Sequence, residues 1–191
     1  MSECPTGREA LSTIRQYNVP VELGSGPGSY FTGNKIVLSR QLSVEDSALT
    51  LIHEAHHASE AYGNTTGDVL RQPRGEFVTT MVNEEAVGAA LEIQAKRELA
   101  EAGRYLTATV PGEQQFLEAA DRGVKRALQD EQGFTSEAAL QGVARKSGTD
   151  ELNDMLWAGD LVASTNREMY PMNYGIFHMR MHRARVVPQE P

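Results

Sequence analysis

Cysteine is nearly absent from this chain, which has Cys4 alone among 191 residues, so an internal disulfide framework is excluded. The first residues lack the cationic start and the apolar stretch of a secretory signal peptide. No apolar run approaches the roughly 18 residues that a helix needs to span a bilayer. We therefore expect a protein that is made in the cytoplasm in reduced form and has no membrane partner. Export by a specialised secretion system would leave no sign of this kind.

Basic residues are in the minority, because 18 Lys and Arg stand against 26 Asp and Glu and give a formal net charge of −8. No basic stripe interrupts this acidic balance, so we expect no nucleic-acid partner. The glycine-rich stretch GSGPG lacks the Lys-Ser/Thr pair and the helix opening of a phosphate-binding loop. A nucleotide site is therefore not expected either.

The length and the 40% hydrophobic content suit a single domain over residues 1–191. After a short helical pattern near the N-terminus, three β-branched or aromatic-rich segments predict strands. These segments are 19–23, 29–31 and 36–39. A glycine-rich turn and the sequence TGNK separate them, so we expect a small antiparallel hairpin or meander.

Two long helices are predicted after the strands. SVED has the form of a capping box, with Ser43 as the N-cap, and Gly63 is a natural C-terminal stop. The second helix, residues 76–102, contains no proline, is rich in helix formers and ends at Gly103.

The remainder of the chain has a helical pattern as well. Its four predicted segments are 111–132, 135–146, 149–164 and 173–186. The expected fold class is therefore α+β and mostly helical. Residues 19–103 would hold the strands and the two long helices, and residues 104–191 would form a helical C-terminal subdomain.

The first long helix contains HEAHH, which has the spacing HExxH. His53 and His57 are four residues apart, so a helix places both imidazoles on one face, close enough to bind one metal ion. Glu54 is displaced by about 100° and can reach a metal-bound water without being a ligand, as a general base must. Zinc suits two imidazoles and one carboxylate, with a fourth position left for water. His56 lies off the cluster face, and we interpret it as a packing or supporting residue.

HEAHH together with NEEAVGAA at 83–90 resembles the zincin metallopeptidases over roughly residues 29–95. The third histidine that metzincins carry, in HExxHxxGxxH, is missing here. Gluzincins take their third ligand from a glutamate on a second helix, and MVNEEAVGAALE fits that description. The sequence is also similar to small bacterial metallopeptidase domains, some of which are toxin or effector modules.

This resemblance implies a third zinc ligand at Glu85 or Glu84. Glu85 is preferred, because it places Gly88 and Ala89 three and four residues on, where small side chains let the two helices approach closely. Glu84 has the Asn-Glu pairing of the thermolysin-like motif and is the alternative. The Asp or Asn that the family normally has four residues after this glutamate, where it hydrogen-bonds a zinc-bound histidine, is missing here.

Glu92 and Asp68 are the two candidates for that supporting contact. Zincins also add a hydrogen-bond donor for the oxyanion of the reaction. Tyr174 is the preferred donor here. The other candidate donors are Tyr170, His178 and His182, followed by Tyr30. His178 and His182 are also four residues apart, but the methionines between and beside them favour a packed helix.

The implied function is a zinc metallopeptidase with a protein or peptide substrate. Zinc would activate a water molecule and Glu54 would act as the general base. The alternative is a zinc-stabilised effector or interaction module without peptidase activity. Structural zinc sites usually have four protein ligands, commonly cysteines, and Cys4 is the only cysteine.

Overall fold

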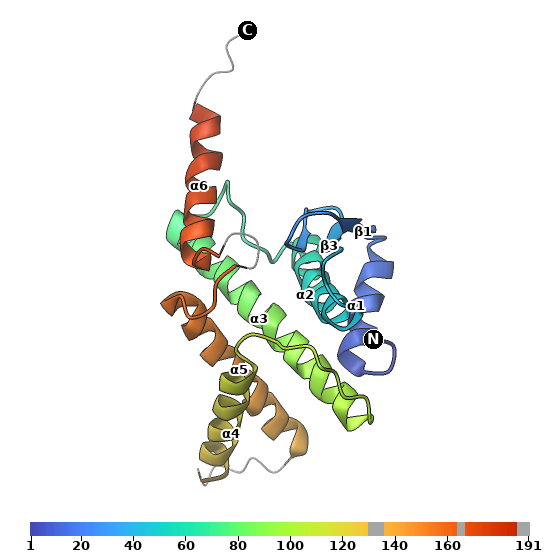
Figure 1. Cartoon of the computed structure of the whole chain (residues 1–191). Coiled ribbons are helices and arrows are strands. Elements are labelled where there is room, and N and C mark those ends of the chain that lie inside the picture. The colour runs from blue at the N-terminus through green and yellow to red at the C-terminus, as the bar shows by residue number, and fades with distance from the viewer. Residues whose placement is uncertain (130–135, 164–166, 187–191) are drawn as a thin grey trace.

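The computed structural model describes residues 1–129, 136–163 and 167–186. Within these residues the chain forms six helices and one three-stranded sheet (Figure 1). The elements are α1 (Pro5–Gln16), β1 (Val21–Gly24), β2 (Tyr30–Phe31), β3 (Ile36–Ser39), α2 (Val44–Gly63), α3 (Arg74–Glu101), α4 (Glu113–Gln129), α5 (Glu137–Ala158) and α6 (Tyr170–Val186). The α+β, mostly helical fold is confirmed. None of the described helices is long and apolar enough to cross a membrane.

The sheet is mixed, so the expectation of an antiparallel hairpin or meander is wrong. The strand order is β1-β3-β2, with β1 parallel to β3 and β2 antiparallel to it. All four residues of β3 are buried, which suits a central strand, whereas β1 is largely exposed at the edge. The Ser39 hydroxyl donates to the Gly26 carbonyl, and the Ser29 hydroxyl accepts from the Ser39 amide. These hydrogen bonds hold the glycine-rich segment against the end of β3. Between β1 and β2 the chain crosses this end of β3, so β3 lies between the two strands that a hairpin would have paired directly.

The two long helices form as predicted and pack against each other. The Ser43 hydroxyl accepts a hydrogen bond from the Asp46 amide at 3.1 Å and so caps α2. The helix ends at Gly63, and Asn64 follows in the left-handed conformation. The apolar positions at helical spacing on α2 are buried in the core that α2 shares with α1, α3 and the sheet. These positions are Leu49, Ile52, Ala55 and Ala58.

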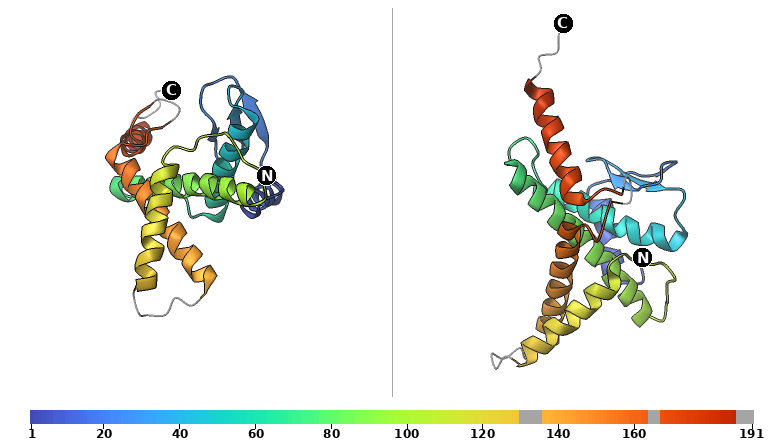
Figure 2. Two further views of the ribbon diagram at one scale, coloured as in Figure 1. Left: turned by 60° about the horizontal axis from the view of Figure 1, so that its bottom comes forward. Right: turned by 60° about the vertical axis from the view of Figure 1, so that its left-hand side comes forward.

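The C-terminal part differs from the prediction in two respects, because the segments predicted at 135–146 and 149–164 form the single helix α5, and this helix ends at Ala158. Positions 130–132, 135 and 164 of the predicted segments lie outside the described residues. Helix α5 runs without interruption through Gly148, which packs against α4. A Cβ atom at Gly148 would lie 2.5 Å from Cδ2 of Phe116, so only glycine lets this ring sit against the helix. Glycine at this point therefore serves a close helix contact rather than a helix break. Figures 1 and 2 show α4 and α5 projecting from the body of the molecule as an antiparallel pair.

Candidate metal centre

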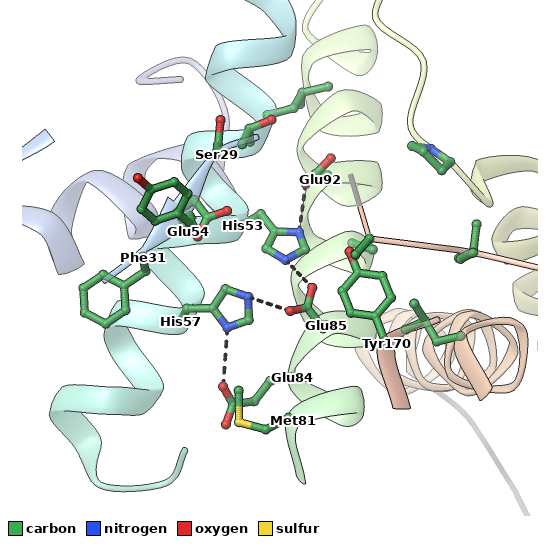
Figure 3. A pocket seen from close by; sticks show the side chains of 18 of the residues that line it. Ser29, Phe31, His53, Glu54, His57, Met81, Glu84, Glu85, Glu92 and Tyr170 are labelled. Carbon is green, nitrogen blue, oxygen red and sulfur yellow. Dashed lines mark hydrogen bonds and ion pairs between the residues drawn. The ribbon is translucent and has the colours of Figure 1, made fainter. Parts of the chain in front are cut away.

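Three side chains from two helices converge at the interface of α2 and α3. His53 and His57 come from α2, Glu85 comes from α3, and one ligand atom of each lies within 4.8 Å of the others. Figure 3 shows both imidazoles pointing at the Glu85 carboxylate. The helical spacing of four residues puts the two histidines on the same face, as the sequence predicted.

The separations between these donors fit a metal ion. Nε2 of His53 is 3.1 Å from Oε2 of Glu85, and Nε2 of His57 is 3.5 Å from Oε1 of the same carboxylate. Tetrahedral ligands bound at about 2.1 Å lie about 3.4 Å from one another. The distances from the carboxylate oxygens to the two imidazole nitrogens are therefore close to those between two ligands of one metal ion. The group could hold a metal ion.

Two further glutamates of α3 contact the Nδ1 atoms of the two histidines (Figure 3). Oε1 of Glu92 is 2.9 Å from Nδ1 of His53, and Oε2 of Glu84 is 3.4 Å from Nδ1 of His57. Carboxylates in this position hold the proton on Nδ1 and leave Nε2 as the metal-binding nitrogen. Glu84 also accepts the amide of Gly67 at 3.2 Å.

Asp68, the other candidate for such support, lies elsewhere. Its carboxylate accepts the backbone amides of Leu70 and Arg71 within the loop between α2 and α3. Of the two acids considered for this role, only Glu92 contacts a histidine of the cluster.

The charges of the cluster reinforce one another. Burial opposes the negative charge of Glu85, but the neighbouring His57 and His53 outweigh it and lower the pKa of this carboxyl to about 2. Burial also lowers the pKa of His53, yet the hydrogen bonds with Glu85 and Glu92 raise that pKa well above its ordinary value. The pKa of His57 is raised as well, against burial, mainly by the charge of Glu85. The carboxylates thus create a negative potential at the two imidazoles, which favours a cation there, and a metal ion would have to displace the imidazole protons.

Glu54 is buried beside the cluster but is not one of the three converging groups. Figure 3 shows it on the β2 side of α2, close to Phe31. Burial raises the pKa of Glu54, and the charges of His53 and His57 oppose that rise. A carboxyl with a raised pKa next to a cation site is better matched to proton transfer near neutral pH than an exposed glutamate.

Helix α6 brings two tyrosines to the same carboxylate. The Tyr174 hydroxyl donates to Oε1 of Glu85. Burial, followed by the charges of Glu85 and Glu54, raises the pKa of Tyr170. Burial and the charge of Glu85 likewise raise the pKa of Tyr174. Both hydroxyls therefore keep their protons and can act as hydrogen-bond donors.

The two histidines of α6 have a different role. Nε2 of His178 lies 3.0 Å from the Gln72 carbonyl, and Nε2 of His182 lies 2.8 Å from the Val69 carbonyl. Their rings stack with centroids 4.2 Å apart. They attach α6 to the loop between α2 and α3, so the packed-helix interpretation fits these contacts.

The remaining candidates lie at the edge of the site or outside it. His56 is not part of the converging group, its Nε2 is buried without a partner among the described residues, and burial lowers its pKa to about 4. Tyr30 lines the cavity but is 48% exposed, and no hydrogen bond is described for its hydroxyl.

The cluster opens into a cavity of about 710 Å³ between β2, α2, α3 and α6. Figure 3 shows Ser29 and Glu92 at one end, and Phe31 and Met81 at the other. Residues 109–111 and 161–163 complete the wall. The three converging side chains therefore border a cavity within the size range of ligand-binding sites.

No protein-family model, no curated protein and no solved structure matches this chain. Sequence reasoning placed the converging residues on two helices but missed the contact of Glu84 with His57. The adjacent position of Glu84 and Glu85 was the available signal, because neighbours on a helix point about 100° apart and can serve two histidines.

Gly88 controls how closely α3 approaches His53. A Cβ atom at this position would lie 2.7 Å from Nε2 of His53, which no real contact allows. We expect Gly88→Ala to displace the imidazole and weaken metal binding about 10- to 100-fold, the loss seen when a ligand is misoriented. Isothermal titration with a divalent metal would measure it. Gly75→Ala is the control, because it lies on the same helix with no atom within 4 Å. Equal affinities in the two variants would contradict this role for Gly88.

The contacts of Glu84 and Glu85 predict unequal losses on removal. Glu85→Ala removes the carboxylate shared by both imidazoles, whereas Glu84→Ala removes only the support behind His57. We expect Glu84→Ala to weaken metal binding about 10- to 100-fold and Glu85→Ala to weaken it further. Competition with a chelator of known affinity would rank the two. The opposite order would move the third ligand to Glu84.

Proposed function

We propose that this protein is a zinc-dependent metallopeptidase that hydrolyses peptide bonds, with a gluzincin-like zincin centre. The proposal rests on one observation. Three groups that could bind a metal ion converge, and a buried glutamate that does not belong to the three lies beside them. His53, His57 and Glu85 would hold the ion, and Glu54 lies next to them in a cavity of peptide size.

The donor set favours zinc in a catalytic role. Two imidazoles and one carboxylate are typical of zinc hydrolases, which keep one position for water or substrate. The single cysteine is buried at the N-terminus, where its thiol contacts the Met1 carbonyl, and it is not part of the converging group. A structural zinc site, usually closed by four protein ligands, would need a fourth group that the cluster does not contain.

Zinc at this position would supply a Lewis acid toward the substrate carbonyl and the attacking water, and no side chain of the site can replace that chemistry. Glu54 would take the proton from the water and pass it to the leaving amine. Its raised pKa favours this exchange in both directions near neutral pH.

Tyrosine hydroxyls would stabilise the negative charge that develops on the carbonyl oxygen. The Tyr174 hydroxyl donates to Glu85, so it also fixes the orientation of a metal ligand. Tyr170 lines the cavity and interacts electrostatically with Glu85, Glu54 and Glu92, which makes it the second candidate donor. Phe replacements of the two tyrosines would separate the roles, because orientation of Glu85 affects metal affinity and oxyanion donation does not.

The test combines elemental analysis with digestion of a broad peptide library. The purified chain should contain about one zinc per molecule and cut library peptides, lose this activity to a chelator and regain it on addition of zinc. A fully zinc-loaded chain that cuts no peptide would refute the peptidase proposal. That outcome would favour a zinc-stabilised interaction module.

A further inference from the structure

The cavity wall is strongly acidic. Five carboxylates line it, and none of the described residues in its lining is a lysine or arginine. The five are Asp46, Glu54, Glu84, Glu85 and Glu92. When all are ionised, a bound divalent cation neutralises two of these charges and leaves an excess of three. The site therefore carries more negative charge than a metal ion needs for its own binding.

Lysines on neighbouring elements do not compensate for this charge. Lys35, in the turn before β3, is 2.7 Å from Glu22, and Lys96, one turn beyond Glu92 on α3, is 2.6 Å from Glu113. Each is paired with a glutamate that does not line the cavity. A concave, low-dielectric wall concentrates the field of the remaining carboxylates inside the cavity.

The same wall has a substantial apolar part. Its aliphatic side chains come from the segment before α2, from α2 itself, from the segment before α4, from α5 and from the segment after α5. They are Leu42, Leu49, Val110, Leu156, Leu161 and Val162. A ligand that fills this space would bury apolar groups while its charged groups meet the field of the carboxylates.

We propose that the cavity selects peptides in which a lysine or arginine stands beside apolar residues, and that it rejects acidic peptides. This inference rests on the proposed peptide substrate. A cationic side chain gains Coulomb energy in the cavity, whereas an acidic one loses its hydration and meets like charge. The carboxylates of the wall would thus have two effects: they favour a bound metal ion, and they determine which peptides bind.

Asp46 is the carboxylate through which this selection can be tested separately. The other four contact the histidines or occupy the position of the base, but Asp46 lies in the first turn of α2 and accepts the Ser43 hydroxyl at 2.7 Å. Asparagine at this position keeps an acceptor for that hydroxyl and removes the charge. Asp46→Asn therefore changes the cavity charge without touching the metal-binding group.

The experiment measures binding, so that it does not depend on turnover. Zinc-loaded Glu54→Gln is titrated, with fluorescence anisotropy as readout, against labelled Ala/Leu nonapeptides that carry lysine, norleucine or glutamate at each position in turn. We expect lysine to bind at least about tenfold more tightly than norleucine at one or more positions, and glutamate to bind more weakly than both. Equal binding of all three, preference for glutamate, or no saturable binding would overturn the inference.

A matched pair of variants locates the source of the preference. Asp46→Asn should reduce the lysine-to-norleucine affinity ratio by about threefold, because one cavity charge is lost. Asp121→Asn removes the same charge from the exposed surface of α4 and should leave the ratio unchanged. Equal reductions in both variants would assign the preference to net charge and refute a role for the cavity. Cleavage of the same peptides by the wild type is scored separately, so binding with lysine preference but without cleavage refutes the peptidase alone.

Discussion

Replacement of Glu54 by glutamine is expected to reduce peptide turnover by about two to four powers of ten while the protein keeps its metal. Glutamine is nearly isosteric with glutamate and leaves His53, His57 and Glu85 in place, but it cannot accept a proton from water. Peptide cleavage rates at saturating zinc, measured alongside metal content, would show the separation of the two properties.

Glu60→Gln is a suitable control for this experiment. It makes the same chemical change on α2, at a residue that does not line the cavity. Comparable cleavage by zinc-loaded Glu54→Gln and wild type would refute the proposed base. Loss of metal in Glu54→Gln would instead place Glu54 among the ligands.

Removal of either histidine should abolish stoichiometric metal binding. His53→Ala and His57→Ala each delete one of the three donors that converge at the site, and two remaining groups cannot define a tight site. Elemental analysis after dialysis, together with equilibrium titration, would measure the loss.

The adjacent histidine provides the control for these two variants. His56→Ala changes the same residue type on the same helix, but His56 is not part of the converging group. We expect it to retain about one metal ion per chain. Stoichiometric metal in both His53→Ala and His57→Ala would show that the ion binds elsewhere.

The features that could be predicted from the sequence depend on local periodicity. The Ser43 cap fixes the start of α2 through a contact within one turn, and the helix ends at Gly63 as expected, with Asn64 rather than the glycine in the left-handed conformation. The spacing of His53 and His57 fixes their common face. The small residue at Gly88 indicated a close helix approach, and this contact is present in the structure.

The features that could not be predicted depend on contacts between distant segments. β1 pairs with β3, and Ser39 at the end of β3 is hydrogen-bonded to the glycine-rich segment that follows β1. The strand pattern of the sequence contains no information on these contacts. The sequence predicted separate segments that end at 146 and begin at 149, whereas Gly148 between them packs against Phe116 on another helix and α5 is continuous there. The contact of Tyr174 with Glu85 spans 89 residues, so the sequence could name this tyrosine but could not place its hydroxyl on a ligand.

The division of the centre between two helices links metal binding to folding. The histidines belong to α2 and the carboxylates to α3, so a bound ion would join the helices as a cross-link that the unfolded chain cannot hold in the same form. A ligand that binds only the folded state stabilises it by about 2.7 kcal/mol at a free concentration 100 times its dissociation constant. The melting temperature of this protein should therefore rise with free metal concentration, and chelation would loosen the same interface that forms the site.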